Sequence, residues 1–236
     1  GIDVSYYKKN SRDQILKMSV PAATGYSFWM INAGNIENKG WEVALTATPL
    51  RKESGFTWET MLNWARNTNE IIELTEGVTR QVLSDGTSIQ NLQIVAEVGG
   101  SYGDLYGRGY LRDDNGNKII GDDGLPIATN DMIKLGNNQP EWMLGWSNTF
   151  SFKNISLGFL IDVNYGGNIY MGSIRTGTRF GTLDMTLDGR ENGLVVEGVT
   201  KSGAPNTVNV SSEQYWKGIS NITEEFVYDA TNIRFR

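Results

Sequence analysis

The sequence predicts an all-β, antiparallel fold that forms part of a transmembrane β-barrel with long extracellular loops and short periplasmic turns. The first observation is an alternation of apolar and polar residues through Glu141–Tyr165, interrupted by Asn148 and by a turn at Asn154. A period of two puts successive side chains on opposite faces of a strand. The second is length: ten residues at about 3.3 Å each, tilted by about 40–45°, rise roughly 25 Å, the height of an outer-membrane barrel's lipid-facing band. The third is that short turns and long connections alternate along the chain, as they do in such barrels.

The composition excludes several kinds of function. The chain of 236 residues has a net charge of −6 and no strongly basic stretch, so nucleic acid is not an expected partner. It lacks histidine and cysteine, which removes the commonest general base, thiolate nucleophiles, zinc–thiolate sites and disulfides. No apolar run reaches the length of a transmembrane helix. The first residues lack the features of a signal peptide and both ends fall inside alternating patterns, so we expect a segment of a longer protein.

The N-terminal region predicts a strand followed by a loop. Alternation begins at Ile2 and is expected to end in the charged stretch Lys8–Asp13. Ile15–Ser27 is expected to be a loop, because Pro21 and Gly25 both disfavour regular structure there.

Glu141–Tyr165 forms one predicted hairpin, and a second hairpin is expected after residue 37. Residues 38–40 form the predicted turn into a strand over 41–48, which Pro49 is expected to end. The turn Arg51–Gly55 then leads into an alternating strand, Phe56–Trp64. This design repeats that of the hairpin in Glu141–Tyr165.

The first long connection, Asn67–Asn138, has irregular apolar spacing. Two polar turns, 113–116 and 121–124, flank a short strand at Lys118–Ile120. A connection of this length is too long for a plain loop, so we expect an ordered excursion with small strands of its own.

The second long connection is Met171–Asn221. Gly181–Leu187 and Ser212–Trp216 are each expected to form a short helix, the latter capped by Ser211 or by Ser212 itself. A last strand is expected to run from Phe226 through Arg236.

Aromatic residues lie near the ends of the predicted apolar faces, where the girdles of a membrane barrel meet the lipid headgroups. They are Trp41, Trp58, Trp64, Trp142 and Tyr165. The same pattern also fits a soluble β-sandwich with the tryptophans in its core. The two folds differ in whether the apolar face points outward or into a closed core, and the residues that decide this are Trp142, Leu144, Phe152, Leu157 and Phe159.

Four segments resemble the C-terminal barrel of SusC/RagA-type TonB-dependent transporters from the outer membranes of Bacteroidetes. They are Asn32–Leu45, Tyr102–Asn117, Leu135–Gly167 and Phe226–Arg236, and they occur in the order that the family has. The resemblance extends over residues 1–236, as a fragment of the receptor β-barrel domain in which the plug domain and the TonB box are absent.

The resemblance implies a parent protein in the cell outer membrane, in contact with outer membrane lipid, that imports large nutrients such as glycans or peptides. It implies two partners, a SusD-like lipoprotein and TonB, the latter acting through the absent N-terminal part. The long connections 67–138 and 171–221 would be extracellular loops that meet the substrate or the lipoprotein. The alternative from the residues alone is a soluble β-rich carbohydrate-binding module or a surface adhesin.

The acidic and glycine-rich motifs do not predict an enzyme. The turn at Asp113 begins like a calcium loop, but Lys118 stands where that loop needs glycine. The glycine-rich stretch at Gly99 lacks the lysine of a phosphate-binding loop. The acidic pairs at 122–123 and 224–225 have the arrangement of solvated acids, so no catalytic residue, cofactor or metal is expected.

Aromatic residues of the long connections are the candidate contacts to a ligand or partner. They are Tyr102, Tyr106, Tyr110, Tyr170 and Trp216. Their apolar faces and polar tips suit stacking on sugar rings. The alternative is that they pack the loops themselves or a partner interface.

Overall fold

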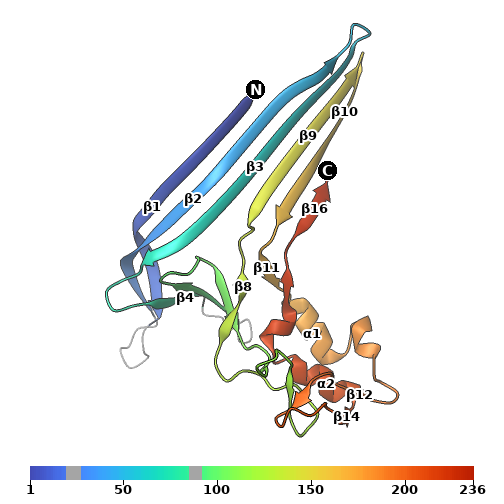
Figure 1. The fold of residues 1–236 in the computed structure, drawn as a ribbon. Helices are drawn as coiled ribbons and strands as arrows, with labels where there is room; N and C mark the ends of the chain where they lie inside the picture. Colours follow the sequence, from blue (N-terminus) through green and yellow to red (C-terminus); the bar gives the residue numbers. More distant parts are fainter. Residues whose placement is uncertain (20–27, 85–91) are drawn as a thin grey trace.

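The computed structural model describes the backbone of residues 1–19, 28–84 and 92–236, and the side chains of residues 1–12, 34–83 and 92–236. Long strands lie side by side in one sheet, and smaller elements gather at one end of it (Figure 1). This antiparallel sheet has six strands in the order β1-β2-β3-β9-β10-β16. Their bounds are β1 (Ile2–Ser19), β2 (Phe28–Arg51), β3 (Phe56–Glu73), β9 (Trp142–Phe152), β10 (Ile155–Tyr165) and β16 (Asn232–Phe235). We call this sheet the wall.

The register of the wall builds one continuous apolar face. Leu144 of β9, for example, lies opposite Trp64 of β3 and Val163 of β10. From β1 to β16 the face carries Ile2, Val4, Tyr6, Trp41, Val43, Leu45, Phe56, Trp58, Leu62, Trp64, Trp142, Leu144, Trp146, Phe150, Phe152, Ile155, Leu157, Phe159, Ile161, Val163, Tyr165, Ile233 and Phe235. Polar and small side chains alternate onto the opposite face, which confirms the predicted period of two.

No second layer of the described chain covers the apolar face. Ile155 is 74% exposed, Leu157 is 64% exposed and Phe235 is 73% exposed. A β-sandwich would bury these side chains against a second sheet. The uncovered face therefore identifies the wall as part of a barrel that turns its apolar side outward, and the barrel is not closed by the described strands.

Two polar side chains interrupt the apolar face, and tryptophans bond to both. The Trp58 indole N–H donates to Oδ1 of Asn148 at 3.0 Å, and the Trp146 indole N–H donates to Oγ1 of Thr60 at 2.9 Å. Asn148 is only 1% exposed. The Trp58 indole thus satisfies an oxygen that the apolar surroundings would otherwise leave unpaired, whereas the Thr60 hydroxyl also donates to the Ser147 carbonyl at 3.3 Å.

Short turns join the strands at one end of the wall, as predicted. Lys153 and Asn154 connect β9 to β10, with Lys153 at a φ of 52°. Residues 52–55 connect β2 to β3, where Gly55 has a φ of 88°. We call this the short-turn end and the opposite one the long-loop end.

The first strand is longer than predicted. Strand β1 does not end in Lys8–Asp13 but continues to Ser19, so the expectation of a loop from Ile15 is wrong for its first residues. The remainder of that predicted loop, residues 20–27, lies outside the described residues. Apolar alternation disappears beyond Tyr6 because the strands continue past the apolar band, where both faces carry polar groups.

The predicted turn at residues 38–40 is wrong, because these residues lie inside β2. Gly40 is needed there for a close approach. A Cβ atom on Gly40 would lie 2.6 Å from the hydroxyl of Tyr7, which crosses β2 to donate a hydrogen bond to Oδ1 of Asn67 at 3.0 Å. The glycine that suggested a turn instead leaves room for a side chain that braces three strands.

The ends of the second hairpin also differ from expectation. Strand β2 passes Pro49 and ends at Arg51, with a register shift between Ala47 and Leu50 that accommodates the proline. Strand β3 runs to Glu73, so the chain leaves the wall after that residue rather than at Asn67.

Small strands and helices form the long connections, as expected. The first connection contains β4 (Arg80–Ser84), β5 (Gln93–Glu97), β6 (Asp104–Gly107) and β8 (Ile133–Asn137), which pair in one four-stranded sheet, and β7 (Ile119–Ile120). The second contains β11 (Asn168–Tyr170), α1 (Gly172–Phe180), η3 (Asp184–Leu187), β12 (Leu194–Val195), β13 (Val199–Thr200), β14 (Asn209–Val210), α2 (Ser212–Ile219), η4 (Thr223–Phe226) and β15 (Val227–Asp229). Neither α-helix is long and apolar enough to cross a membrane, among the residues described.

One predicted helix is confirmed and one is wrong in position. Helix α2 begins at Ser212, and Ser211 caps it in a reciprocal pair with Gln214. At Gly181–Leu187 only the four-residue 3₁₀ helix η3 forms, and the longer helix α1 precedes it. Helix α1 gave little sequence signal because it has no side-chain cap and contains glycine and threonine. The predicted last strand is divided into β15 and β16.

Candidate functional site in the long loops

The two long connections form one body, which we call the loop unit and define as residues 74–141 and 166–231. Strand β7 of the first connection pairs in parallel with β13 of the second, joining Ile119 to Val199. Beside this pair, Ile120 packs in a buried cluster with Val196 and Val210. The sequence could not show this fusion, because each partner lies about 80 residues from the other.

Glutamates 224 and 225 fasten the two connections together. The Tyr110 hydroxyl donates to the Glu225 carboxylate at 2.6 Å, and its backbone N–H donates to Glu224 at 2.7 Å. The Arg112 guanidinium also donates to Glu224, at 2.7 Å. These acids, expected to be merely solvated, are therefore structural partners of the first connection.

Burial and carboxylate contacts keep two loop tyrosines neutral. Tyr110 is 4% exposed, and burial, followed by its hydrogen bond to Glu225, raises its pKa well above the ordinary value. The hydrogen bond to Glu97, followed by burial, raises the pKa of Tyr106 to about 12. Both hydroxyls are thus held as hydrogen-bond donors.

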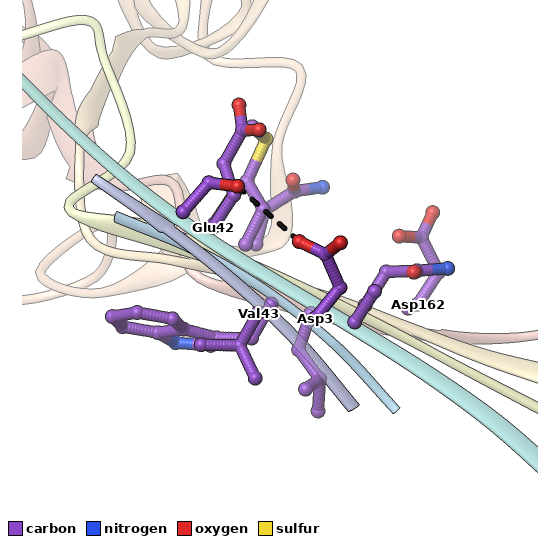
Figure 2. Close-up of a pocket in the computed structure, with 13 residues that line it drawn as sticks. Asp3, Glu42, Val43 and Asp162 are labelled. Atoms are coloured by element: carbon purple, nitrogen blue, oxygen red, sulfur yellow. Dashed lines mark hydrogen bonds between the residues drawn. The ribbon is translucent and has the colours of Figure 1, made fainter. Parts of the chain in front are cut away.

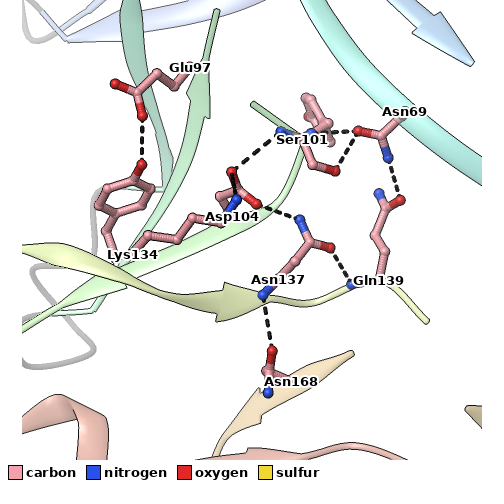
Figure 3. Close-up of polar contacts among 10 residues, drawn as sticks. Asn69, Glu97, Ser101, Asp104, Lys134, Asn137, Gln139 and Asn168 are labelled. Carbon is pink, nitrogen blue, oxygen red and sulfur yellow. Dashed lines mark hydrogen bonds and ion pairs between the residues drawn. The ribbon is translucent and has the colours of Figure 1, made fainter. Parts of the chain in front are cut away.

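A buried carboxylate organises the junction between the loop unit and the wall (Figure 3). Asp104 of β6 is 1% exposed and accepts from the Lys134 ammonium at 2.7 Å and the Asn137 amide at 2.8 Å. The backbone N–H of Ser101 lies 3.3 Å from the same carboxylate. Because the buried Asp104 of β6 bonds to two side chains of β8, these contacts fix the two strands relative to each other.

Asn69 extends this network onto β3 (Figure 3). Its side-chain oxygen accepts from the Ser101 hydroxyl at 2.8 Å and from the Tyr102 backbone N–H at 2.6 Å, and its amide donates to Gln139. The loop unit is therefore fastened to a strand of the wall by side chains on both sides of the junction.

The five aromatic residues predicted as ligand contacts are dispersed over the loop unit. Tyr102 is 37% exposed, whereas Tyr106 and Tyr110 are engaged through their hydroxyls. The Tyr170 hydroxyl and the Trp216 indole N–H are buried and have no hydrogen-bond partner within the described residues. No hydrogen bond or ring contact joins any two of the five in the part of the chain that the structure describes. The structure does not bring them together as one platform.

Trp216 does line a hollow of about 650 Å³ between α1, η3 and α2. Phe180, which is 72% exposed, lines it with Arg179, Arg190 and the ion pair of Lys217 with Glu213. An aromatic surface beside cationic groups suits a ligand with apolar faces and anionic or polar substituents. Sequence reasoning missed Arg179 and Phe180 because helix α1 was not predicted, and it missed Arg190 because that residue reaches the hollow only through tertiary packing.

Arg190 is held in place in this hollow. Its guanidinium donates to the Gly181 carbonyl at 2.7 Å and to the Thr186 carbonyl at 3.0 Å. These bonds satisfy carbonyl groups at the end of α1 and in η3.

The polar face of the wall holds a second hollow, of about 370 Å³ (Figure 2). The carboxylates of Asp3, Glu42 and Asp162 point to the same side of the sheet, and Val43 points to the other. Asp162 has a cation nearby, Arg236, at 3.5 Å. In a barrel with its apolar side outward, this face lines the lumen, which is therefore polar and partly acidic.

The turn that resembled a calcium loop is closed by its own hydrogen bonds. One oxygen of the Asp113 carboxylate accepts from the backbone N–H groups of Asn115 and Asn117, at 3.0 and 2.8 Å. Its other oxygen accepts from the Asn117 amide, and these bonds lower the pKa of Asp113. Within the described ranges, no group of three or more acidic side chains is arranged to hold a metal ion.

The sequence is similar to several TonB-dependent receptors. It is 26% identical over 192 residues to TonB-dependent receptor P26 of Formosa agariphila, covering 71% of this chain and 19% of that protein. It is 26% identical over 181 residues to TonB-dependent receptor SusC of Bacteroides thetaiotaomicron, covering 72% of this chain and 18% of SusC. No family model matches the sequence. The chain thus spans about a fifth of the length of these relatives.

The fold is also that of solved transporter structures. The RagAB peptide importer in the "closed-closed" state superposes with a TM-score of 0.69 over all of this chain and 26% of that one, at 18% identity. Its "open-open" state gives a TM-score of 0.66. The likeness to these two structures lies in the fold, and it includes both the wall and the loop unit.

Proposed function

We infer that this chain is a segment of the SusC/RagA type of TonB-dependent receptor, and on that premise that it helps to import large nutrients across the outer membrane. Its wall would form part of the lipid-embedded barrel, and its loop unit would lie outside the cell. The observation that carries the proposal is the uncovered apolar face of six strands with all long connections at one end.

The proposed substrate is a glycan or a peptide that contacts the loop unit before it enters the lumen. The exposed ring of Tyr102 and the hollow beside Trp216 support this, because aromatic surfaces near cationic groups bind sugars and peptide side chains. The RagAB structures are described as a peptide importer, which favours peptides. Tyr106, Tyr110 and Tyr170 would then shape the loop unit that presents this surface.

The proposed partners are a SusD-like lipoprotein at the loop unit and TonB, which would act through a part of the parent protein not included in this chain. Because its two connections are fused at Tyr110 and Glu225, the loop unit would present a preformed surface to the lipoprotein. A soluble carbohydrate-binding module is disfavoured by the exposed apolar face.

Two matched serine-to-cysteine variants of the full-length parent receptor test the orientation. Ser202 lies at an exposed turn of the loop unit and Ser54 in an exposed turn at the short-turn end. This chain contains no cysteine, so it adds no background labelling. A membrane-impermeant maleimide should label Ser202→Cys in intact cells and Ser54→Cys only after the outer membrane is permeabilised. Equal labelling of both in intact cells would overturn the proposal.

Uptake tests the substrate. Cells that carry the receptor should accumulate a fluorescent peptide or glycan, whichever class is correct, and Trp216→Ala with Phe180→Ala should reduce that uptake. Ile155→Ala, in the wall at the short-turn end, serves as the control. Unchanged uptake in the double variant would remove the hollow from the substrate path.

A further inference from the structure

A group of cations faces outward at the long-loop end of the wall. In the strand register, Tyr6, Trp41 and Arg66 are level with one another, and Lys8 and Lys39 are level with Thr68 in the next outward-facing row. Since alternate residues share a face, these side chains lie on the same face as Val4 and Val43. We call Lys8, Lys39 and Arg66 the cationic group.

The cationic group lies where the apolar band ends. Carrying the pairing of Ala65 with Met143 one residue further puts Arg66 level with Trp142, whose ring stacks on Tyr165 at 5.0 Å. The Tyr6 and Trp41 rings, which are level with Arg66, lie 4.9 Å apart. Tryptophan and tyrosine rings mark the boundary between hydrocarbon and headgroups. The next row is about 7 Å further along the strands, which places Lys8 and Lys39 at headgroup depth.

The cations are only partly neutralised by their neighbours. Lys8 and Lys39 share one carboxylate, Glu37, at 2.9 and 3.8 Å. A second acid, Glu70, pairs with Glu37 in the register. Arg66 is exposed, and its guanidinium has no ion pair or hydrogen bond within the described part of the chain. The group therefore retains an unpaired guanidinium on β3, beside two lysines of β1 and β2 that are about half exposed.

A hollow joins Lys39 and Arg66 to the aromatic rings. Its volume is about 380 Å³, and it is lined by Tyr6, Lys39, Gly40, Trp41, Arg66 and Thr68. A guanidinium forms paired hydrogen bonds to phosphate oxygens, and an ammonium adds a point charge. The hollow thus offers phosphate-binding groups directly above an apolar surface.

We propose that Lys8, Lys39 and Arg66 bind the phosphate of an outer-leaflet lipid headgroup, whose acyl chains lie along the apolar face below Trp41. The occupant follows from charge complementarity and from the continuity of the hollow with the lipid-facing surface. The inference rests on the proposed function, because it requires the long-loop end to lie in the outer leaflet. The bound lipid would fix the depth of β1, β2 and β3 in the membrane.

Native mass spectrometry of the full-length parent receptor tests this binding. The receptor is released from phosphatidylcholine micelles that contain monophosphoryl lipid A or its dephosphorylated form. The test variant is Lys8→Gln with Lys39→Gln and Arg66→Gln. The control removes equal charge at the short-turn end, with Arg51→Gln, Lys52→Gln and Lys153→Gln. Each cation near a phosphate is worth about fivefold in affinity, so the test variant should bind the phosphorylated lipid at least about tenfold more weakly.

Three outcomes would overturn the inference. They are unchanged binding in the test variant, equal weakening in both variants, and equal binding of the dephosphorylated lipid. Displacement by inorganic phosphate at the same concentration as the lipid would show a simple anion site and overturn the lipid assignment. A gel shift on heating shows whether each variant is folded. Labelling of Ser202→Cys in intact cells separates the two proposals, since that labelling can succeed while lipid binding fails.

Discussion

The wall and the loop unit bury their apolar residues in opposite ways. The large side chains of the wall, such as Leu157 and Ile233, are exposed at 64% and 72%. In the loop unit, Phe226 and Ile219 are fully buried. The fully buried apolar residues of the described chain belong to the loop unit or, like Ile71, to the part of the wall that lies beyond Tyr6 and Trp41 towards the long-loop end. One chain therefore follows two rules for its side chains, because one part faces lipid and the other faces water.

The largest expected effect is a loss of stability in the loop unit that leaves the wall folded. Phe226→Ala removes a fully buried ring, which should cost the loop unit about 3–5 kcal/mol. Hydrogen exchange of the parent receptor should accelerate in residues 166–231, while the amides of β9 and β10 keep their protection. Equal acceleration in both regions would show that the two parts fold as one unit.

A charge placed on either face of one strand sharpens the contrast within the wall. Ile161→Arg points outward and should destabilise the folded receptor by about 2–4 kcal/mol, whereas the neighbouring Leu160→Arg points to the lumen and should cost much less. Urea unfolding in lipid vesicles, followed by the heat-dependent gel shift, measures both. Similar costs for the two variants would contradict the assignment of the faces.

Loss of an indole hydrogen bond on the apolar face should reduce stability by a smaller amount. Trp58→Phe keeps an aromatic ring but leaves Oδ1 of Asn148 without its donor, at a cost of about 1–3 kcal/mol. Trp64→Phe is the matched control, since no hydrogen bond to its indole occurs among the described residues. The same urea series should separate the two variants, and equal stabilities would show that the indole bond contributes nothing.

The smallest effect depends on pH. The folded-state pKa of Tyr106 is raised from 10.0 to about 12, so its stabilising contribution is complete below pH 10 and is lost as the pH rises through about 12. The stability of the parent receptor should therefore fall more steeply in that window than that of Tyr106→Phe. Parallel curves for the two proteins would show that the Glu97 contact does not hold Tyr106 neutral.

The same contrast explains which features could be predicted from the sequence. Alternation through Trp142–Tyr165 predicted the wall, because residues that face lipid alternate along each strand with residues that line a lumen. The pattern vanished at Lys8, where the strands pass the apolar band and both faces carry polar groups. Gly40 suggested a turn, although it instead leaves room for Tyr7 to cross β2.

The candidate site was less predictable. The aromatic residues were found by type alone, but their surroundings depend on contacts between distant segments, such as Tyr110 with Glu225. The cations Arg179 and Arg190 stand beside Trp216 only because α1 packs against α2. No local pattern encodes that packing.

The connection at Lys153 and Asn154 has a consequence for the order of folding. It joins β9 to β10 over two residues, so this hairpin can close within microseconds. The pairing of β3 with β9, by contrast, spans a chain segment that includes the whole first connection. Closing so long a segment carries a larger entropic cost and is slow. We therefore expect the β9–β10 hairpin to form first and to wait for the four-stranded sheet of β4, β5, β6 and β8 to shorten the gap. The loop unit would then hold the ends of β3 and β9 close enough to pair.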